Sequence, residues 1–177
     1  MKKALLLAGF AGMVAANANA IDVTPYVGLD ANYSTVDRDS STNISPKNWS
    51  AAAILGARTD HYGIELGYDH GKREHESNAE RRGSTRLSKY TVDLLGFQPL
   101  GCSGRWELVG SAGVTFNKID GHGSYKSDHG YGERLGGGLQ YALTENLAVR
   151  AMYHYNWIHQ SYINHTNEIS LGLRYSF

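Results

Sequence analysis

Apolar and polar residues alternate with a period of two along most of this chain. The last nine residues are a clear case, because apolar residues occupy positions 169, 171, 173, 175 and 177. Ser170, Gly172, Arg174 and Ser176 stand between them. A period of two is typical of a β-strand with one apolar and one polar face, whereas a helix needs apolar spacings of three and four. The C-terminal segment is therefore predicted to be a strand.

The same alternation recurs in seven earlier segments. They are "TPYVGLDANY", "NWSAAAILGAR", "YGIELGYDH", "YTVDLLG", "RWELVGSAGVTFN", "ERLGGGLQYAL" and "LAVRAMYHYNW". Eight strands of roughly ten residues would each be long enough to cross a bilayer at a tilt. Short connections are expected at 59–61, 99–104 and 144–147, and long polar ones at about 35–47, 71–87, 118–130 and 158–166. Short turns at one end and long loops at the other are typical of a transmembrane β-barrel.

The apolar face must meet either a protein core, as in a soluble β-sandwich or lipocalin-type barrel, or lipid. The polar face is rich in glycine and small residues, which suits the narrow interior of an eight-stranded barrel. The apolar face ends in aromatic residues. At the loop end these are Tyr33, Trp49, Tyr68, Tyr90, Phe116, Tyr155 and Trp157, and at the turn end they are Tyr62, Trp106, Tyr141, Tyr175 and Phe177. Two aromatic girdles favour lipid, so the predicted fold is all-β, an eight-stranded antiparallel transmembrane barrel.

The N-terminus resembles an export signal. Lys2 and Lys3 precede an apolar run that ends in two small-residue sites, at 16–18 and 18–20. A basic start, a short apolar segment and such a site are the parts of a secretory signal peptide. We expect a signal peptide at 1–20 and one barrel domain at 21–177.

Composition excludes several other classes. The formal net charge is +0 and basic residues do not gather in one segment, so a nucleic-acid partner has no support. A single cysteine, Cys102, excludes an internal disulfide. No pattern indicates a cofactor.

Charged residues on the polar face form the first candidate site. They are Asp30, Arg58, Glu65, Asp93, Glu107, Arg134, Arg150, Glu168 and Arg174. A small barrel has no room for an open channel, and isolated buried ions are costly, so these charges must pair. We interpret them as a salt-bridged plug, with a proton or ion path as the alternative.

The long polar segments carry two weaker candidates. Six histidines fall in or beside them, namely His70, His75, His122, His129, His159 and His165; their spacing fits no rigid zinc motif, so solvated loop histidines are the preferred interpretation and no metal is expected. The segment at 71–87 carries Lys72, Arg73, Arg81, Arg82 and Arg86. These basic residues could bind phosphate or acidic glycan groups, or pair with Glu74, Glu76 and Glu80.

The signal peptide, the eight strands and the closing "LGLRYSF" resemble the small outer-membrane barrels of Gram-negative bacteria, in particular the opacity-protein and neisserial surface protein A group, akin to OmpX and the OmpA transmembrane domain. "GERLGGGLQYALTENLAVRAMYHYNWI" and "NEISLGLRYSF" carry most of the likeness. The resemblance implies an outer-membrane location and a role in adhesion or surface recognition, with a contribution to envelope integrity. It also implies that Tyr175 and Phe177 form the signal read by the barrel-assembly machinery. Outer-membrane lipids, lipopolysaccharide, periplasmic chaperones and host-cell ligands are the expected partners.

Two alternatives remain, a narrow porin and a hydrolase that modifies lipid A. His159, Ser161 and Glu168 could supply a base, a nucleophile and an acid. The order resembles the PagL-type lipid A deacylases, but Tyr162 stands where their His-x-Ser-Asn motif has asparagine. The expected protein is therefore not an enzyme.

Overall fold

The computed structural model describes residues 22–37, 47–71, 74–78, 81–122, 128–160 and 163–177. Side chains are described for 22–35, 49–71, 88–118, 130–158 and 165–177. The predicted signal peptide, at 1–20, lies outside these ranges.

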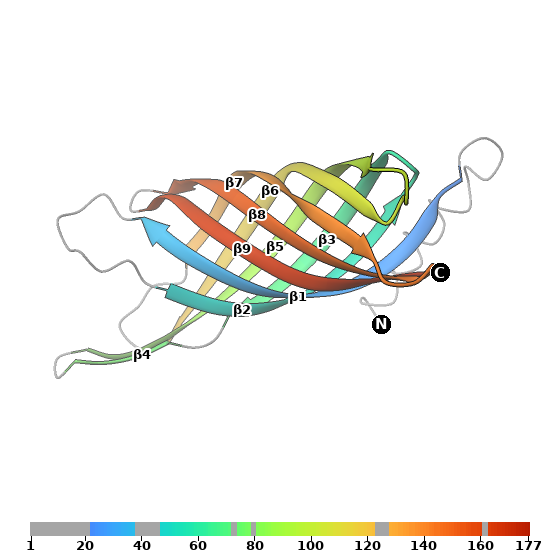
Figure 1. The fold of residues 1–177 in the computed structure, drawn as a ribbon. Helices are drawn as coiled ribbons and strands as arrows, with labels where there is room; N and C mark the ends of the chain where they lie inside the picture. The colour runs from blue at the N-terminus through green and yellow to red at the C-terminus, as the bar shows by residue number, and fades with distance from the viewer. Residues whose placement is uncertain (1–21, 38–46, 72–73, 79–80, 123–127, 161–162) are drawn as a thin grey trace, which may run out of the picture.

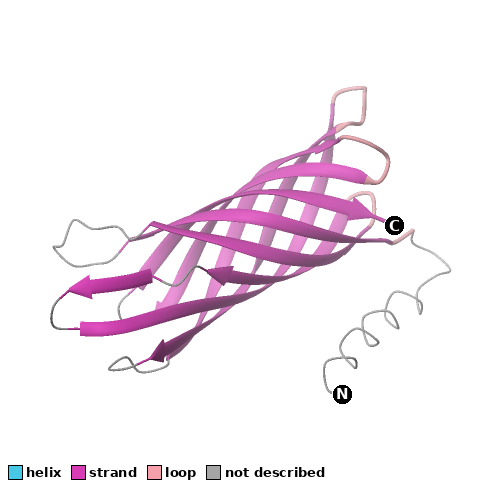
Figure 2. Cartoon of the chain, turned by 90° about the horizontal axis from the view of Figure 1, so that it is seen from below, coloured by secondary structure: helices cyan, strands magenta, loops and turns pink. Residues whose placement is uncertain are grey.

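Every element in the described part of the chain is a β-strand (Figure 1). In chain order they are β1 (Thr24–Asp37), β2 (Lys47–Arg58), β3 (Tyr62–Gly71), β4 (Glu74–Asn78), β5 (Arg81–Leu100), β6 (Trp106–His122), β7 (Asp128–Ala142), β8 (Leu147–Gln160) and β9 (Ile163–Ser176). All pairings are antiparallel, in the order β3-β2-β1-β9-β8-β7-β6-β5-β4, and β3 also pairs with β5. That last pairing closes the sheet. Because β4 only adds to the far end of β5, beyond β3, the body of the barrel has eight strands, as predicted (Figure 2).

The strands are strongly staggered around the barrel. The stagger is found by stepping from each residue to its partner on the next strand, once around the barrel. Starting at His61, just before β3, the steps lead to Phe97, Val109, Gly138 and Met152. They continue through Ser170, Asn32 and Ser50. They return to β3 ten residues further along, at Gly71. A stagger of this size tilts the strands, and the tilt sets the narrow interior of an eight-stranded barrel.

The strands are longer than the sequence predicted. β5 spans 20 residues and β6 spans 17, against the expected ten. At the loop end they run into segments at 71–87 and 118–130 that were expected to be loops. The prediction was wrong there because backbone pairing continues after the apolar face ends, and two polar faces leave no alternation to detect.

The two faces of the barrel divide as the alternation predicts. Large apolar side chains point outward, including Leu29, 69% exposed, and Leu171, 58% exposed, while polar and charged side chains are buried inside. The outward rings also form pairs near both ends. The pairs are Tyr33–Trp49, Tyr68–Tyr90 and Tyr155–Trp157 at the loop end, and Trp106–Tyr141 and Tyr175–Phe177 at the turn end. This is the arrangement expected of a barrel surrounded by lipid.

Short turns gather at the end where β9 finishes. They occupy 59–61, 101–105 and 143–146. In the second turn, Gly101 and Gly104 have φ of 71° and 62°, a left-handed conformation that favours glycine. In the described residues, no helix is both long and apolar enough to span a bilayer.

Candidate functional site

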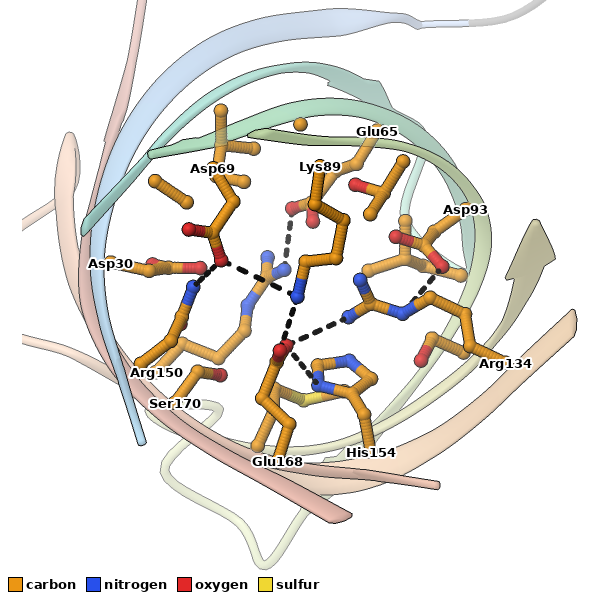
Figure 3. Close-up of a pocket in the computed structure, with 18 of the residues that line it drawn as sticks. Asp30, Glu65, Asp69, Lys89, Asp93, Arg134, Arg150, His154, Glu168 and Ser170 are labelled. Carbon is orange, nitrogen blue, oxygen red and sulfur yellow. Dashed lines mark hydrogen bonds and ion pairs between the residues drawn. The ribbon is translucent and has the colours of Figure 1, made fainter. Parts of the chain in front are cut away.

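Charged side chains fill the interior of the barrel (Figure 3). All nine residues of the predicted interior set are described, and the alternation of each strand directs them inward. The structure brings them together in two groups, one near the turn end and one near the loop end.

Glu65 is the centre of the group near the turn end. Its Oε1 accepts hydrogen bonds from the Tyr26 hydroxyl at 2.7 Å, from Arg150 Nη1 at 2.5 Å and from Arg174 Nε at 3.3 Å. The Arg174 guanidinium also binds both carboxylate oxygens of Asp30. Four charges on four strands therefore satisfy one another directly.

A second pair closes the interior at the turns. Arg58 donates to both oxygens of Glu107, at 2.7 and 2.9 Å. Gln140 links this pair to the first group, because its Nε2 donates to Glu107 at 2.7 Å and its Oε1 accepts from Arg150 at 2.8 Å. Three arginines thus balance three carboxylates in the half of the barrel nearer the turns.

Lys89 and Glu168 are the centre of the group near the loop end. Lys89 Nζ donates to Glu168 and lies 3.3 Å from Asp69, which also accepts from Asn32 at 2.7 Å. Arg134 lies between two carboxylates, 3.3 Å from Asp93 and 3.9 Å from Glu168.

Lys89, Asp69 and His154 were absent from the predicted interior set. His154 Nδ1 lies 3.9 Å from Glu168. The sequence could have identified Lys89 as an inward residue, because it alternates in step with the inward Thr91 and Asp93. It stands one position before the segment in which the alternation was recognised. Its register partner on β3 is Asp69.

Glycines make room for these long side chains. Gly113 on β6 lies in register between Asp93 and Arg134, and a Cβ there would meet the Asp93 carboxylate. Likewise, a Cβ at Gly172 would meet Asp30. Asp93 on β5 and Arg134 on β7 can therefore pair across β6, because Gly113 carries no side chain at that level.

An apolar layer also crosses the interior near the turn end. It consists of Leu95, Phe97, Val109 and Met152, which are 1–5% exposed. The Arg58 guanidinium stacks on the Phe97 ring, 3.9 Å from its centroid. The sequence analysis missed this layer because Val109 and Phe97 lie on the face expected to be polar.

Little space remains between these side chains. The cavity offers about 30 Å³ to water, room for about two water molecules. A few buried polar atoms within the described residues have no hydrogen-bond partner in the protein, among them Asn32 Oδ1 and Thr115 Oγ1. They would suit such water molecules. Paired charges thus occupy most of the interior and leave room for little water.

The comparisons with known proteins agree with this geometry. The family model of the outer membrane protein beta-barrel domain matches residues 4–177. The chain belongs to this family. It is therefore an outer-membrane protein. A separate comparison with curated proteins found no significant match.

Solved outer-membrane barrels share the fold. Neisserial surface protein A is 20% identical with a TM-score of 0.67, over 88% of this chain and 99% of that one. Ail, the attachment invasion locus protein of Yersinia pestis, is 17% identical with a TM-score of 0.61, over 89% of this chain and 100% of that one. That structure is a complex of Ail with the heparin analogue sucrose octasulfate. OprG from Pseudomonas aeruginosa is 15% identical with a TM-score of 0.56, over 87% and 96%.

The barrel's C-terminal residues lie beside the turns. The rings of Tyr175 and Phe177 meet edge to face at 5.4 Å between centroids. Phe177 N donates to Pro25 O at 3.1 Å, and the residue is 71% exposed. Both rings thus face outward at the turn-end girdle, and their role as an assembly signal stays a prediction.

Three of the five basic residues predicted for recognition lie on a described strand, at the barrel's loop end. Arg81, Arg82 and Arg86 belong to β5, with Asn78, Ser77 and Asp120 as register partners. Lys72 and Arg73 lie outside the described residues.

The hydrolase trio is not assembled in the described part of the barrel. Ser161 lies outside it, as does the side chain of His159, whereas Glu168 is buried in the interior beside Lys89. An acid inside the barrel is poorly placed for a lipid substrate outside it.

Histidines do not assemble a metal site among the described side chains, where no group of three or more potential ligands occurs. His70 lies at the loop end of β3 beside Tyr68, and His165 stacks on Tyr155 at 5.3 Å between ring centroids. The side chains of His75, His122, His129 and His159 lie outside the description.

Proposed function

We propose that this outer-membrane barrel is a closed surface protein that binds anionic glycans through its loop end and contributes to envelope integrity. The observation that carries the proposal is the filled interior, in which paired charges and an apolar layer occupy the lumen. A barrel whose interior is occupied acts through what it presents outside the membrane.

Arginines of the β4–β5 hairpin are the proposed recognition residues. Five basic residues, at 72, 73, 81, 82 and 86, exceed the three glutamates of this segment. Guanidinium groups bind sulfate, phosphate and carboxylate in a bidentate manner. The complex of Ail with a heparin analogue supports the choice of ligand class. Lipopolysaccharide phosphates on neighbouring lipids and acidic glycans on host cells both offer such groups.

Heparin binding by the refolded barrel in nanodiscs tests the proposal. We expect the triple variant Arg81→Ser/Arg82→Ser/Arg86→Ser to bind at least about tenfold more weakly, because each guanidinium supplies charge-assisted hydrogen bonds. Arg105→Ser, in the turn at 101–105, is the control and should bind like the wild type. Equal binding by the triple variant, or binding that does not weaken as salt rises, would contradict the proposal.

The enzyme alternative has a separate test. Lipid A from cells with and without the protein should give identical mass spectra, because we propose no catalytic centre. A loss of one acyl chain that depends on the protein would make it a hydrolase, and His159, Ser161 and Glu168 would then be the residues to change.

Assembly and envelope roles are proposed on the same basis. The assembly machinery and periplasmic chaperones would deliver the barrel, with Tyr175 and Phe177 as its signal. Cells that lack the protein should leak more under detergent stress.

A further inference from the structure

Four strands present a row of aromatic rings at the loop end of the barrel. From β3 across β5 and β6 to β7, the register partners are Tyr68, Tyr90, Phe116 and Tyr131. All four are 41–61% exposed, so they face outward. Outward aromatic rings at the end of a transmembrane barrel lie where the acyl chains of a membrane meet the headgroups.

A second row of register partners lies two residues beyond the rings. It consists of His70, Ser88, Lys118 and His129, and we call it the outer polar row. Positions two residues apart share one face of a strand. The outer polar row therefore continues the outer face of the wall toward the loop end. It contains two histidines, a serine and a lysine, but no acid.

Two members of the outer polar row reach the surface with described side chains. His70 and Lys118 are both exposed, whereas Ser88, in register between them, is 7% exposed. The Tyr68 hydroxyl lies 3.4 Å from His70 Nδ1, so the imidazole rests at the loop-side edge of the aromatic row. His70 and Lys118 are thus the groups that a molecule in the surrounding membrane would meet first.

The nearby acids of the outer face lie above or below the outer polar row. Asp120, two residues beyond Lys118 on β6, is the register partner of Arg86. Glu133 lies nearer the membrane centre on β7, opposite Trp157. The strands on either side of Lys118 place a serine and a histidine opposite it. The outer polar row is therefore a cationic level of the wall, which suits an anionic group.

We propose that the outer polar row binds the phosphate groups of lipids in the outer leaflet, with His70 and Lys118 as its main contacts. An ammonium group and an imidazole N–H both donate hydrogen bonds to phosphate oxygens. The aromatic row beneath packs against the acyl chains of the same lipid. Headgroup and chains are each met at the depth that they occupy in a membrane, which favours a phosphate-bearing lipid over a soluble anion.

Lipid binding at the outer polar row is independent of the proposed glycan binding. The glycan contacts are arginines of β5 at 81, 82 and 86, which lie further from the membrane. The triple arginine variant should therefore keep its response to lipid phosphate, and His70→Gln/Lys118→Gln should keep its binding to heparin. Either proposal can fail while the other stands.

Thermal unfolding of the barrel in phosphatidylcholine nanodiscs tests the proposal. Lipid A with its phosphates, added as a minor component, should raise the unfolding midpoint by at least about 3 °C relative to lipid A stripped of its phosphates. Inorganic phosphate should leave the midpoint unchanged. Equal midpoints with the two lipids would overturn the proposal. An equal rise with inorganic phosphate would also overturn it, because the site would then bind a soluble anion.

Substitutions provide the second arm. His70→Gln/Lys118→Gln should lose most of the rise that the lipid phosphates cause. The control His61→Gln/Arg105→Gln makes a comparable change at exposed positions in the turns and should keep the rise. Both pairs lie outside the barrel interior, so each variant should fold. A response of His70→Gln/Lys118→Gln equal to that of the wild type would overturn the proposal.

Discussion

Lys89 and Glu168 form an ion pair across the interior of the barrel, although their strands, β5 and β9, are not neighbours. Their side chains are 13% and 5% exposed. The pair thus links strands on different sides of the barrel, in an interior where little water is available to solvate the two charges. Its partners Asp69 and Arg134 come from two further strands.

Removing one member of this pair should destabilise the barrel strongly. We expect Glu168→Gln to lower the free energy of unfolding by about 3–5 kcal/mol, because Lys89 and Arg134 lose a shared carboxylate. Urea unfolding of the barrel in detergent micelles measures it. The double variant Lys89→Met/Glu168→Leu should cost less than the sum of the single variants, because no unpaired charge remains. Additive costs would mean that the two residues do not interact.

Gly137 and Gly138 offer a matched test of the division between outer and inner faces. A Cβ at Gly138 would meet Ala151 O and, at 2.7 Å, Met152 Sδ, whereas the nearest atom to one at Gly137 is 4.0 Å away. Gly138→Ala should therefore destabilise the barrel by about 1–3 kcal/mol, through overpacking. Gly137→Ala should be neutral or slightly stabilising, because alanine fits a strand better than glycine. If both substitutions changed the stability equally, the assignment of Gly138 to the inner face and Gly137 to the outer face would be contradicted.

Phe97 should contribute more to stability than an outward side chain of similar size on the same strand. It is 3% exposed and supports the Arg58 guanidinium, so Phe97→Ala should cost about 3–5 kcal/mol. Leu94, 64% exposed, faces outward, and Leu94→Ala should cost much less. Thermal unfolding followed by electrophoretic mobility compares the two. A smaller effect at Phe97 would show that the apolar layer is not a core.

Deletion of Phe177 should reduce the amount of assembled barrel in the outer membrane several-fold, if the terminal aromatic is an assembly signal. Tyr62→Ala is the control, because Tyr62 is 74% exposed at the same girdle and lies far from the terminus. It should assemble normally. Unchanged levels after the deletion would leave Phe177 as a girdle residue only.

Much of the fold followed from one property of the sequence. Alternation identifies a strand wherever one face meets lipid and the other a polar interior, so the eight strands and the inward direction of residues such as Glu65 and Arg150 were predictable. The same signal disappears where both faces meet water, and for that reason the outer ends of β5 and β6 were taken for loops.

Partners inside the barrel were less predictable than positions. Parity places Glu65, Arg150 and Arg174 in the interior, but only the stagger of the strands brings them to one height. The apolar layer was missed because a single apolar residue on the polar face, such as Phe97 or Val109, looks like an isolated break in the alternation. Only the structure shows that Leu95 and Met152 pack beside them.

The conductance of the purified barrel in planar lipid bilayers tests the central claim most directly, since the account rests on an interior sealed by paired charges and an apolar layer. We predict no stable channel openings at neutral pH. Long-lived openings of uniform size, reproduced across preparations, would contradict the sealed interior and make the protein a pore.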